Sequence, residues 1–209
     1  MFQHKLEFLA TIDEKNFGVP RDDHYYADNA AFAAMVDSAI NVSSEHEDSL
    51  VLIGAKPEWP EVEFGWIEPG VSIANGSQTP LFGVSRFREK PRFAEVRSLM
   101  RKGGLWNTFI TIGRASAFLK LLSATVLPAM TRLAEAIVNR NLDRVYNELE
   151  IIDFSKHVLS AEPGGLFVMA DNMSGWADLG NQARVIHTLD RNNTEPDWLR
   201  EMRRSDVAA

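Results

Sequence analysis

Residues 49–67 read SLVLIGAKPEWPEVEFGWI, and this stretch decides the fold class. Its apolar core is four consecutive residues, Leu50 to Ile53, which end at Gly54. A short unbroken apolar run bounded by turn residues is typical of a strand that is buried on both faces of a parallel sheet. The sequence therefore predicts an interior strand here.

A helix precedes this strand. Asp28 is a plausible N-cap, because its carboxylate can accept a hydrogen bond from the first turn of a helix. Apolar residues then recur at helical spacing, namely Phe32, Met35, Val36, Ala39 and Ile40. The polar connector SSEHEDS at 43–49 ends this predicted helix near Val42. Helix, short loop and buried strand form one unit of an α/β fold.

Downstream of the strand the pattern changes to short β-like pieces, which cover Gly65–Glu68, Val71–Ile73 and Leu81–Arg88. The pair Asn75 and Gly76 between them is a hairpin-turn signal. An amphipathic helix is predicted from Phe93 to Met100, and Gly103 and Gly104 close it. A second buried strand follows over 105–112.

The second half of the chain alternates helices with one more strand. Helical stretches are predicted over 116–124, 128–139 and 142–149. Ser155 can cap a further short helix, and residues 166–170 form a last apolar strand. The helix predicted over 179–189 presents one apolar face, formed by Ala183, Ile186 and Leu189. Together these elements predict an α/β fold with a mixed central sheet.

Size and charge bound the function. With 209 residues the chain is expected to hold one domain, over residues 20–189. Residues 1–19 show no clear period, and 190–209 form a charged tail with a short helix around Trp198. A formal charge of −7 argues against general nucleic-acid binding, although a local pocket can still take a small phosphorylated ligand. The absence of cysteine excludes disulfides, thiolate zinc sites and cysteine nucleophiles.

The sequence also predicts a location. The N-terminal residues MFQHKLEFLATIDEK carry charges and have no long apolar core, so they are not a secretory signal. The most apolar stretch, 105–130, is interrupted by Arg114 and Lys120, which argues against a membrane span. We therefore expect a cytoplasmic protein without membrane contact.

Several polar residues stand where a ligand or a structural role would explain them. Asp23 with His24 could hold a divalent cation, or belong to a solvated turn. Gly65 between aromatic residues could let a ligand approach the backbone, or mark a β-bulge. Glu89 and Lys90 at a strand end could bind hydroxyls and a phosphate, or form an exposed charge cluster.

Two further positions are open in the same way. Asn107 interrupts an apolar run, and a buried amide needs a partner in the backbone, in solvent or in a ligand. Asp178 lies between Gly175 and Gly180, just before a predicted helix, where it could bind a metal or cap that helix. Taken singly, each position has a structural explanation at least as good as the functional one.

The order and spacing of these pieces carry more than any one of them. In chain order they are Asp23-His24, Leu50 to Ile67, Phe87 to Pro91, Leu105 to Asn107, and Gly175 to Gly180. This series resembles the sugar-1-phosphate nucleotidyltransferases, and among them is most similar to the mannose-1-phosphate guanylyltransferases. The resemblance covers roughly residues 20–189 and implies a Rossmann-like, glycosyltransferase-A-like fold, of which this sequence carries an incomplete version.

The resemblance implies an enzyme and a reaction. A phosphate oxygen of a sugar 1-phosphate, here mannose 1-phosphate, attacks the α-phosphate of GTP. Pyrophosphate leaves and GDP-mannose forms. Such catalysis rests on positioning and on charge neutralisation by Mg²⁺ and basic side chains.

Roles follow residue by residue from the matching motifs. Asp23 and Asp178 match the family's metal-binding aspartates, with Asp22 as an alternative to Asp23 because the loop has one residue more. Lys90 matches the residue that faces the sugar phosphate, and with Asp23 it forms the expected catalytic set. The sugar-binding positions are Gly65, Trp66, Glu89, Lys90 and Asn107. The resemblance predicts that Gly65, Glu89, Lys90, Asn107 and Asp178 converge on one pocket.

The sequence also departs from the family's pattern. The family opens with a glycine-rich GGxGxRLxPL loop that cradles the triphosphate, and nothing like it occurs in this sequence. Trp66 stands in place of Tyr, Ala177 in place of Ser, and Thr108-Phe109 in place of Ser-Gly.

These departures leave alternatives to an active enzyme open. One is a truncated, non-catalytic remnant, and the other is a regulatory subunit that keeps only a sugar-phosphate pocket. Because the resemblance implies that neighbouring strands are missing, we expect the strand Leu50–Ile53 to lack partners. An unpaired apolar strand favours homo-oligomers or pairing with an N-terminal partner chain.

Overall fold

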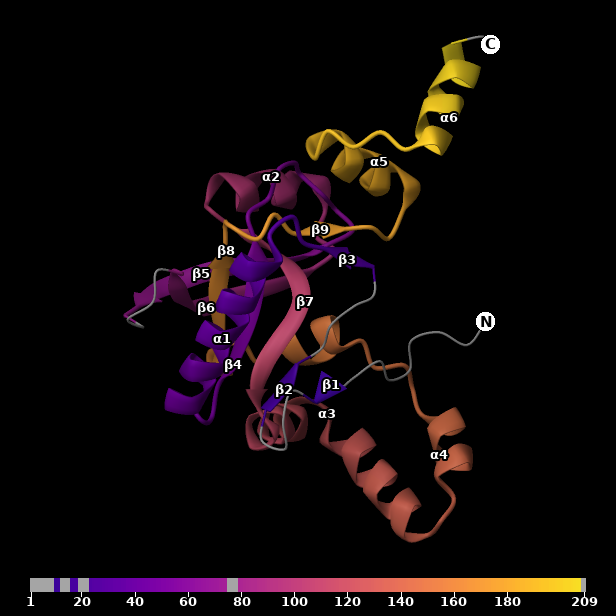
Figure 1. Cartoon of the computed structure of the whole chain (residues 1–209). Helices are drawn as coiled ribbons and strands as arrows, with labels where there is room; N and C mark the ends of the chain where they lie inside the picture. The colour runs from indigo at the N-terminus through magenta and orange to yellow at the C-terminus, as the bar shows by residue number, and fades with distance from the viewer. Residues whose placement is uncertain (1–9, 12–15, 19–22, 75–78, 208–209) are drawn as a thin grey trace.

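One mixed sheet forms the centre of the computed structural model, which describes residues 10–11, 16–18, 23–74 and 79–207 (Figure 1). The strand order is β1-β2-β7-β4-β8-β6-β5. The strands are β1 (Ala10–Thr11), β2 (Asn16–Gly18), β4 (Leu50–Ala55), β5 (Gly65–Ile73), β6 (Leu81–Glu89), β7 (Leu105–Arg114) and β8 (Leu166–Asp171). Among these described strands β4 and β8 pair in parallel, and the other neighbours pair antiparallel. The predicted mixed sheet is confirmed.

The predicted interior strand is β4. All of its residues are buried, and it pairs with β7 on one edge and β8 on the other. The expectation that this strand would lack partners is therefore wrong. Two strands that follow it in the sequence supply both edges, so exposed backbone on β4 gives no reason for pairing with another chain.

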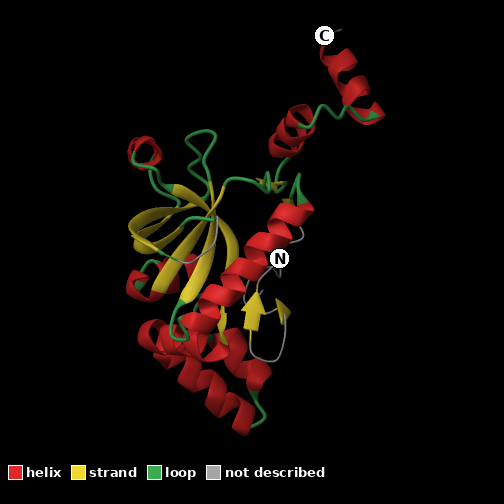
Figure 2. Cartoon of the chain, turned by 60° about the vertical axis from the view of Figure 1, so that its left-hand side comes forward, coloured by secondary structure: helices red, strands yellow, loops and turns green. Residues whose placement is uncertain are grey.

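A further pairing closes the sheet on itself. β5 pairs with β6 along its length and also with β7, through Trp66 opposite Trp106 and Ile67 opposite Leu105. The ladder β7-β4-β8-β6-β5 thus returns to β7 and forms a ring, which is seen as the strongly curved strands in Figure 2. The closure places β5 between β6 and β7, and the candidate site lies across these three strands.

Helix α1 (Asn29–Glu45) covers one face of the sheet. The Asp28 Oδ1 atom accepts a hydrogen bond from the Ala31 N–H at 2.9 Å, as predicted for the N-cap. Apolar side chains of the helix and the sheet meet here, namely Met35, Ala39, Val42, Val51, Ile53 and Ile112. The helix runs past its predicted end to Glu45, and the hydroxyls of Ser43 and Ser44 bond back to the Ile40 carbonyl within it instead of ending it.

The opposite face carries α3 (Ala115–Val138) and the short π-helix η1 (Ser155–Leu159). Side chains alternate along β4, so Leu50 and Leu52 point to this face. They pack in one cluster with Ala117, Phe118, Leu121, Val158 and Leu159. Ser155 does not cap a helix as predicted, because it lies inside η1 and is buried.

Helix α3 joins two of the predicted helices across a kink. Val126 has non-helical backbone angles (φ −130°, ψ 32°), two residues before Pro128. Proline removes a backbone donor and disfavours a helical residue before it, so the kink is expected at this place. The second half of α3 and α4 (Leu142–Glu148) leave the sheet as an arm (Figures 1 and 2), linked by an Arg132–Glu148 ion pair at 3.4 Å.

By length and composition α3 is also long and apolar enough to cross a membrane. Its most apolar window has a mean hydropathy of 1.4, and 11% of that window is buried. The apolar stretch 105–130 of the sequence overlaps this helix over residues 115–130, and Lys120 lies within the overlap.

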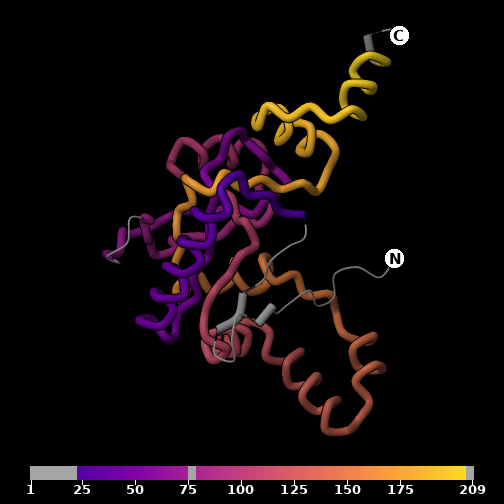
Figure 3. The backbone as a smooth tube through the Cα atoms, in the orientation of Figure 1, coloured from indigo at the N-terminus to yellow at the C-terminus, as the bar shows by residue number. Residues whose placement is uncertain are grey.

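Most of the remaining elements lie at the end of the sheet nearest the C-terminus. They are β3 (His24–Tyr25), α2 (Phe93–Arg101), β9 (Ala177–Asp178), α5 (Gln182–Arg191) and α6 (Asp197–Val207). The short 3₁₀ turn η2 (Pro163–Gly165) lies at the opposite end, where β8 begins. Figure 3 shows β3 and β9, distant in sequence, side by side, and they pair antiparallel. Gly103 has a positive φ of 78° after α2, which confirms the predicted closure of that helix.

Two expectations need comment. The helix predicted over 179–189 begins at Gln182, because Asn181 caps it, and Ala183 is exposed while Thr188 is buried. Its inward face is therefore more polar than predicted. The turn residues Asn75 and Gly76 lie outside the described part of the chain, although β5 and β6 do pair as an antiparallel hairpin.

Candidate functional site

Three of the predicted sugar-binding residues lie in a row across three neighbouring strands. Gly65 on β5 is directly opposite Glu89 on β6. On its other side, β5 pairs with β7 at Trp66 and Trp106, so Gly65 is one step along this ladder from Asn107. Because side chains alternate along a strand, the three positions share one face of the sheet. The structure brings them together from positions far apart in the sequence.

The absence of a side chain at Gly65 leaves a space between Glu89 and Asn107. A Cβ atom at this position would lie 2.9 Å from Glu89 Oε2, 2.9 Å from Phe87 Cζ and 3.2 Å from Asn107 Cβ. Any side chain here would collide with the carboxylate and the ring. Glycine is therefore required by close packing rather than by its backbone angles.

Two polar atoms beside Gly65 are buried without a hydrogen-bond partner in the described part of the chain. They are Glu89 Oε2 and Asn107 Nδ2. The Asn107 side chain is otherwise fixed, because its Oδ1 atom accepts a hydrogen bond from the Phe109 N–H at 3.2 Å. An unpaired buried polar atom costs about 1–3 kcal/mol. Such atoms are commonly retained at a site where a ligand completes the hydrogen bonds.

The pKa of the Glu89 carboxyl lies near neutral pH. Burial, together with the nearby Asp153 carboxylate, raises the pKa of Glu89 to about 7, although Lys90 and a hydrogen bond with the Ser155 hydroxyl oppose the shift. Asp153 and Ser155 were not predicted as site residues. Their contact with Glu89 arises only from the packing of η1 against β6, which no local sequence pattern records.

The backbone of this region is strained at two non-glycine residues. Lys90, directly after β6, has φ 45°, and Phe109 on β7 has φ 62°. Phe109 lies in a bulge, since the β4–β7 register shifts between Leu52 and Gly54. The left-handed region costs an ordinary residue about 1–2 kcal/mol. Strain of this kind is concentrated at functional sites.

Trp66 and Lys90 are placed differently from the row. The Trp66 indole is fully buried on the opposite face, in a cluster with Phe64, Trp106 and Trp176, and its Nε1 atom donates to the Glu61 carbonyl at 2.8 Å. The Trp66 side chain therefore packs on the face of β5 that points away from Glu89 and Asn107, and not toward a ligand at the row. Lys90 is exposed and follows Glu89 directly in the chain.

The predicted metal ligands Asp23 and Asp178 form a second cluster, because β3 and β9 pair there. His24 is opposite Asp178, and the Leu179 N–H donates to the Asp23 carbonyl at 2.7 Å. A Cβ atom at Gly180 would lie 2.9 Å from Asp178 Oδ1 and 3.5 Å from Asp23 Oδ2. The space at Gly180 is lined by these two carboxylates and by Arg184 Nη1, which would lie 3.7 Å from the same Cβ atom. Carboxylate oxygens are ligands that Mg²⁺ prefers, but the described residues bring no third His, Asp or Glu to this place. Asp22 lies outside the described residues.

This second cluster lies on the aromatic side of the sheet rather than with Gly65. Asp178 lines a small cavity of about 20 Å³ together with Phe64, Trp106 and Trp176. Trp106 is the strand neighbour of Asn107, so its side chain points to the opposite face. The structure therefore places Gly65, Glu89 and Asn107 in one group and Asp23 and Asp178 in another.

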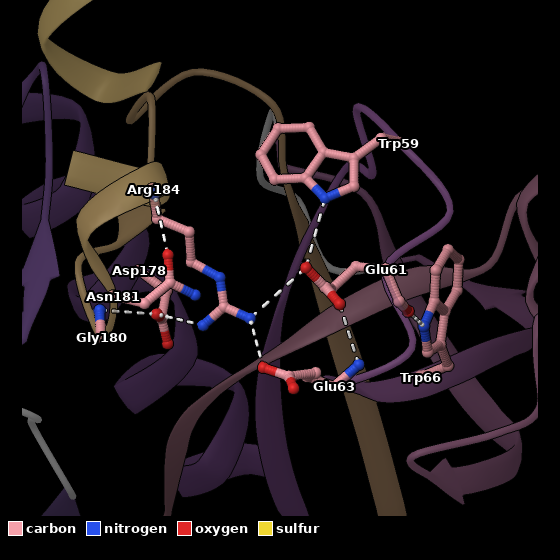
Figure 4. Close-up of polar contacts among 8 residues, drawn as sticks. All are labelled: Trp59, Glu61, Glu63, Trp66, Asp178, Gly180, Asn181 and Arg184. Carbon is pink, nitrogen blue, oxygen red and sulfur yellow. Dashed lines mark hydrogen bonds and ion pairs between the residues drawn. The ribbon is translucent and has the colours of Figure 1, made fainter. Parts of the chain in front are cut away.

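Arg184 on α5 is the centre of the polar contacts around Asp178 (Figure 4). Its Nη1 atom donates to Asp178 Oδ1 at 2.7 Å, and its Nη2 atom donates to Glu61 and Glu63 at 3.3 Å each. The guanidinium also lies 4.3 Å from the centre of the Phe64 ring. Sequence reasoning missed this residue, because its partners on 61–63 are more than a hundred residues away.

Comparison with known proteins identifies the family. A profile of the family described as nucleotidyl transferase matches residues 5–191.

The chain belongs to the nucleotidyl transferase family.

Among curated relatives, it is 28% identical over 192 residues to the mannose-1-phosphate guanylyltransferase of Escherichia coli, which covers 85% of this chain and 39% of that protein. It is 36% identical over 101 residues to the xanthan biosynthesis protein XanB of Xanthomonas campestris pv. campestris, covering 48% of this chain and 20% of XanB. The chain thus spans well under half the length of these curated relatives.

A solved structure supports the fold assignment. The structure titled mannose-1-phosphate geranyltransferase, from Thermus thermophilus, superposes with a TM-score of 0.71 at 24% identity and covers 84% of this chain and 50% of that one. At this identity the likeness shows the fold alone. The predicted glycosyltransferase-A-like fold of the nucleotidyl transferase family, with its mixed sheet, is confirmed.

Proposed function

We propose that this nucleotidyl transferase chain binds a sugar 1-phosphate and serves a reaction of the mannose-1-phosphate guanylyltransferase type. In that reaction a phosphate oxygen of mannose 1-phosphate forms a bond to the α-phosphorus of GTP. The bond between the α- and β-phosphates breaks, pyrophosphate leaves, and GDP-mannose forms. The relatives named as guanylyltransferases support the reaction class, and the row of residues on β5, β6 and β7 supports the sugar.

The observation that carries the proposal is the pair of unpartnered polar atoms beside Gly65. Glu89 Oε2 can accept hydrogen bonds from sugar hydroxyls, and Asn107 Nδ2 can donate to a hydroxyl or ring oxygen. Gly65 lets a sugar ring approach the backbone between them. A polyhydroxylated ligand supplies both donors and acceptors, so it can satisfy the two atoms at once.

Two groups of residues are proposed to neutralise the negative charge of the substrates. Lys90 is exposed next to Glu89 and would neutralise the sugar phosphate. Asp23 and Asp178 would hold Mg²⁺, beside the space that Gly180 leaves. When bound, the ion would supply positive charge at this second cluster, on the other face of the sheet from Gly65, Glu89 and Asn107. The protein's own residues supply orientation, because no covalent step on the protein is required.

The first experiment measures mannose 1-phosphate binding to the full chain by calorimetry. The Glu89→Gln and Asn107→Ala variants are expected to bind at least about tenfold more weakly, since each removes a hydrogen bond worth about 1.4 kcal/mol or more. Glu135→Gln is a matched control, because Glu135 is exposed and lies on the second half of α3, which leaves the sheet. Equal binding by all four proteins would exclude the proposed sugar site.

The second experiment measures pyrophosphate release from GTP and mannose 1-phosphate. The assay is run with the chain alone and with a separate polypeptide that carries the family's glycine-rich segment. Turnover in either case supports the enzyme. Sugar-phosphate binding without turnover in both cases would instead support the non-catalytic remnant or regulatory subunit.

A further inference from the structure

The carboxylate of Asp178 is already engaged by a cation of the protein itself. Its Oδ1 atom accepts two hydrogen bonds, from Arg184 Nη1 at 2.7 Å and from the Gly180 N–H at 2.9 Å. Both side chains of the ion pair are largely buried, with 13% of Arg184 and 5% of Asp178 exposed. A carboxylate oxygen offers two lone pairs, so this oxygen is saturated.

The same guanidinium has a second set of acceptors. Arg184 Nη2 reaches Glu61 and Glu63, of which Glu61 is mostly buried and Glu63 is 69% exposed. Burial alone would raise the pKa of Glu61, but hydrogen bonds from the Glu63 N–H, the Trp59 indole and Arg184 outweigh it and lower the pKa. Glu61 is therefore a fixed anion at neutral pH. Arg184 is shared between it and Asp178.

Arg184 lies in the first turn of α5, where a positive charge is unfavourable unless nearby groups stabilise it. It is the third residue of α5, and its N–H donates to the cap residue Asn181 at 3.0 Å. A positive charge is unfavourable at a helix N-terminus, where the macrodipole is itself positive. The acceptors and the Phe64 ring offset that cost, and they keep the guanidinium beside Asp178.

We propose that Arg184 is a positioning residue that competes with a divalent cation for Asp178, with Glu61 and Glu63 as the alternative acceptors that retain its guanidinium. The inference rests on the proposed metal role of Asp23 and Asp178. A cation at Asp178 would bind a carboxylate that already accepts two hydrogen bonds, and it would lie beside the Arg184 guanidinium, 2.7 Å from Oδ1. Like charges this close repel in a partly buried site. Arg184 therefore lowers the affinity of the pair for divalent ions.

The test is a titration of the full chain with Mn²⁺, in which electron paramagnetic resonance measures the concentration of the free ion. The Arg184→Met variant is expected to bind Mn²⁺ at least about tenfold more tightly than the wild type, about 1.4 kcal/mol. The Arg184→Lys variant keeps the charge and is expected to stay close to the wild type. In an Asp178→Asn background, Arg184→Met is expected to have no effect.

Arg191 provides the matched control. It lies on the same helix and lines the same small cavity, but it donates its hydrogen bonds to Glu58 and to the Gly175 carbonyl rather than to Asp178. Arg191→Met is expected to leave the Mn²⁺ affinity unchanged. Thermal unfolding of each variant is recorded by circular dichroism, so that every titration can be run at a temperature at which the variant is folded.

The outcomes separate this inference from the proposed function. Wild-type Mn²⁺ binding that depends on Asp178 but does not tighten in Arg184→Met overturns the role of Arg184 and leaves the metal site standing. No Asp178-dependent binding in any variant overturns both. Tightening in Arg184→Met together with a failure of mannose 1-phosphate to bind supports the inference while removing the sugar proposal.

Discussion

A single methyl group at Gly65 tests the candidate sugar site most directly. In Gly65→Ala, the new Cβ would lie 2.9 Å from both Glu89 Oε2 and Phe87 Cζ. Real Cβ contacts are essentially never this short, so a neighbour must move. Phe87 is 4% exposed and is held in the main core cluster, so its ring has little room to yield. Glu89 would be pushed out of the row.

The size of the effect follows from two opposing terms. Overpacking costs about 1–3 kcal/mol, and replacing glycine by alanine in a strand recovers about 0.5–1 kcal/mol of backbone entropy. The net expectation is a loss of about 1–2 kcal/mol in the free energy of unfolding, measured in urea. Mannose 1-phosphate binding should weaken by more than about tenfold, since the ring loses its approach to the backbone.

Gly83 on β6 supplies the control. A Cβ there meets no heavy atom closer than 4.0 Å, so Gly83→Ala should be neutral or slightly stabilising and should bind the ligand normally. If Gly65→Ala unfolds and binds as Gly83→Ala does, the space beside Glu89 is not what the coordinates indicate, and the argument for a sugar site fails.

Three further predictions concern neighbouring residues. The folded-state pKa of Glu89, about 7, lies above its ordinary 4.5, so its charge costs stability progressively as the pH rises from about 4.5 to about 7. The melting temperature of Glu89→Gln should therefore gain on the wild type across that window, and a constant difference would contradict the shift. Trp66→Phe removes the hydrogen bond to the Glu61 carbonyl and should destabilise the chain by about 1–3 kcal/mol while leaving mannose 1-phosphate affinity unchanged; weaker binding would show that the indole reaches the ligand. At Phe109, glycine should be more stable than alanine by about 1 kcal/mol in urea unfolding, and the reverse order would mean that φ at this residue is negative.

The sequence predicts those parts of the fold that have a local period. The apolar run at 50–53 and the helical spacing of Phe32 to Ile40 both locate real elements, because burial in each depends on near neighbours in the chain. The closure of the ring through Trp66 and Trp106 is a long-range pairing without such a signal. The expectation of an unpartnered β4 was wrong for the same reason, since it assumed that the neighbours of β4 come from upstream of it, whereas β7 and β8 follow it in the sequence.

The candidate site divides in the same way. Gly65, Glu89 and Asn107 could be chosen because each is an unusual residue for its surroundings, and the family's motif order then related them. Ser155 and Asp153 could not, because they are ordinary residues for the loop before a short helix. Arg184 could not either, since its role depends on acceptors contributed by 61–63, more than a hundred residues before it.

Two partly buried glutamates show that hydrogen-bond partners, more than burial, decide the direction of a pKa shift in this molecule. Burial raises the pKa of both Glu61 and Glu89. Glu61 receives three hydrogen bonds, from an N–H, an indole and a guanidinium, and its pKa falls below the ordinary value. Glu89 receives one from Ser155 and faces Asp153, so its pKa stays high and Oε2 stays unpaired.

The hydrogen bonds of the Glu61 carboxylate are thus satisfied within the protein, whereas Glu89 Oε2 has no partner among the described residues. A sugar that donates hydroxyls to Glu89 would do for it what the surrounding residues do for Glu61, and would lower its pKa. Binding and proton release at Glu89 should therefore be coupled near neutral pH. This coupling is a property that a merely structural glutamate, already satisfied by its neighbours, would not have.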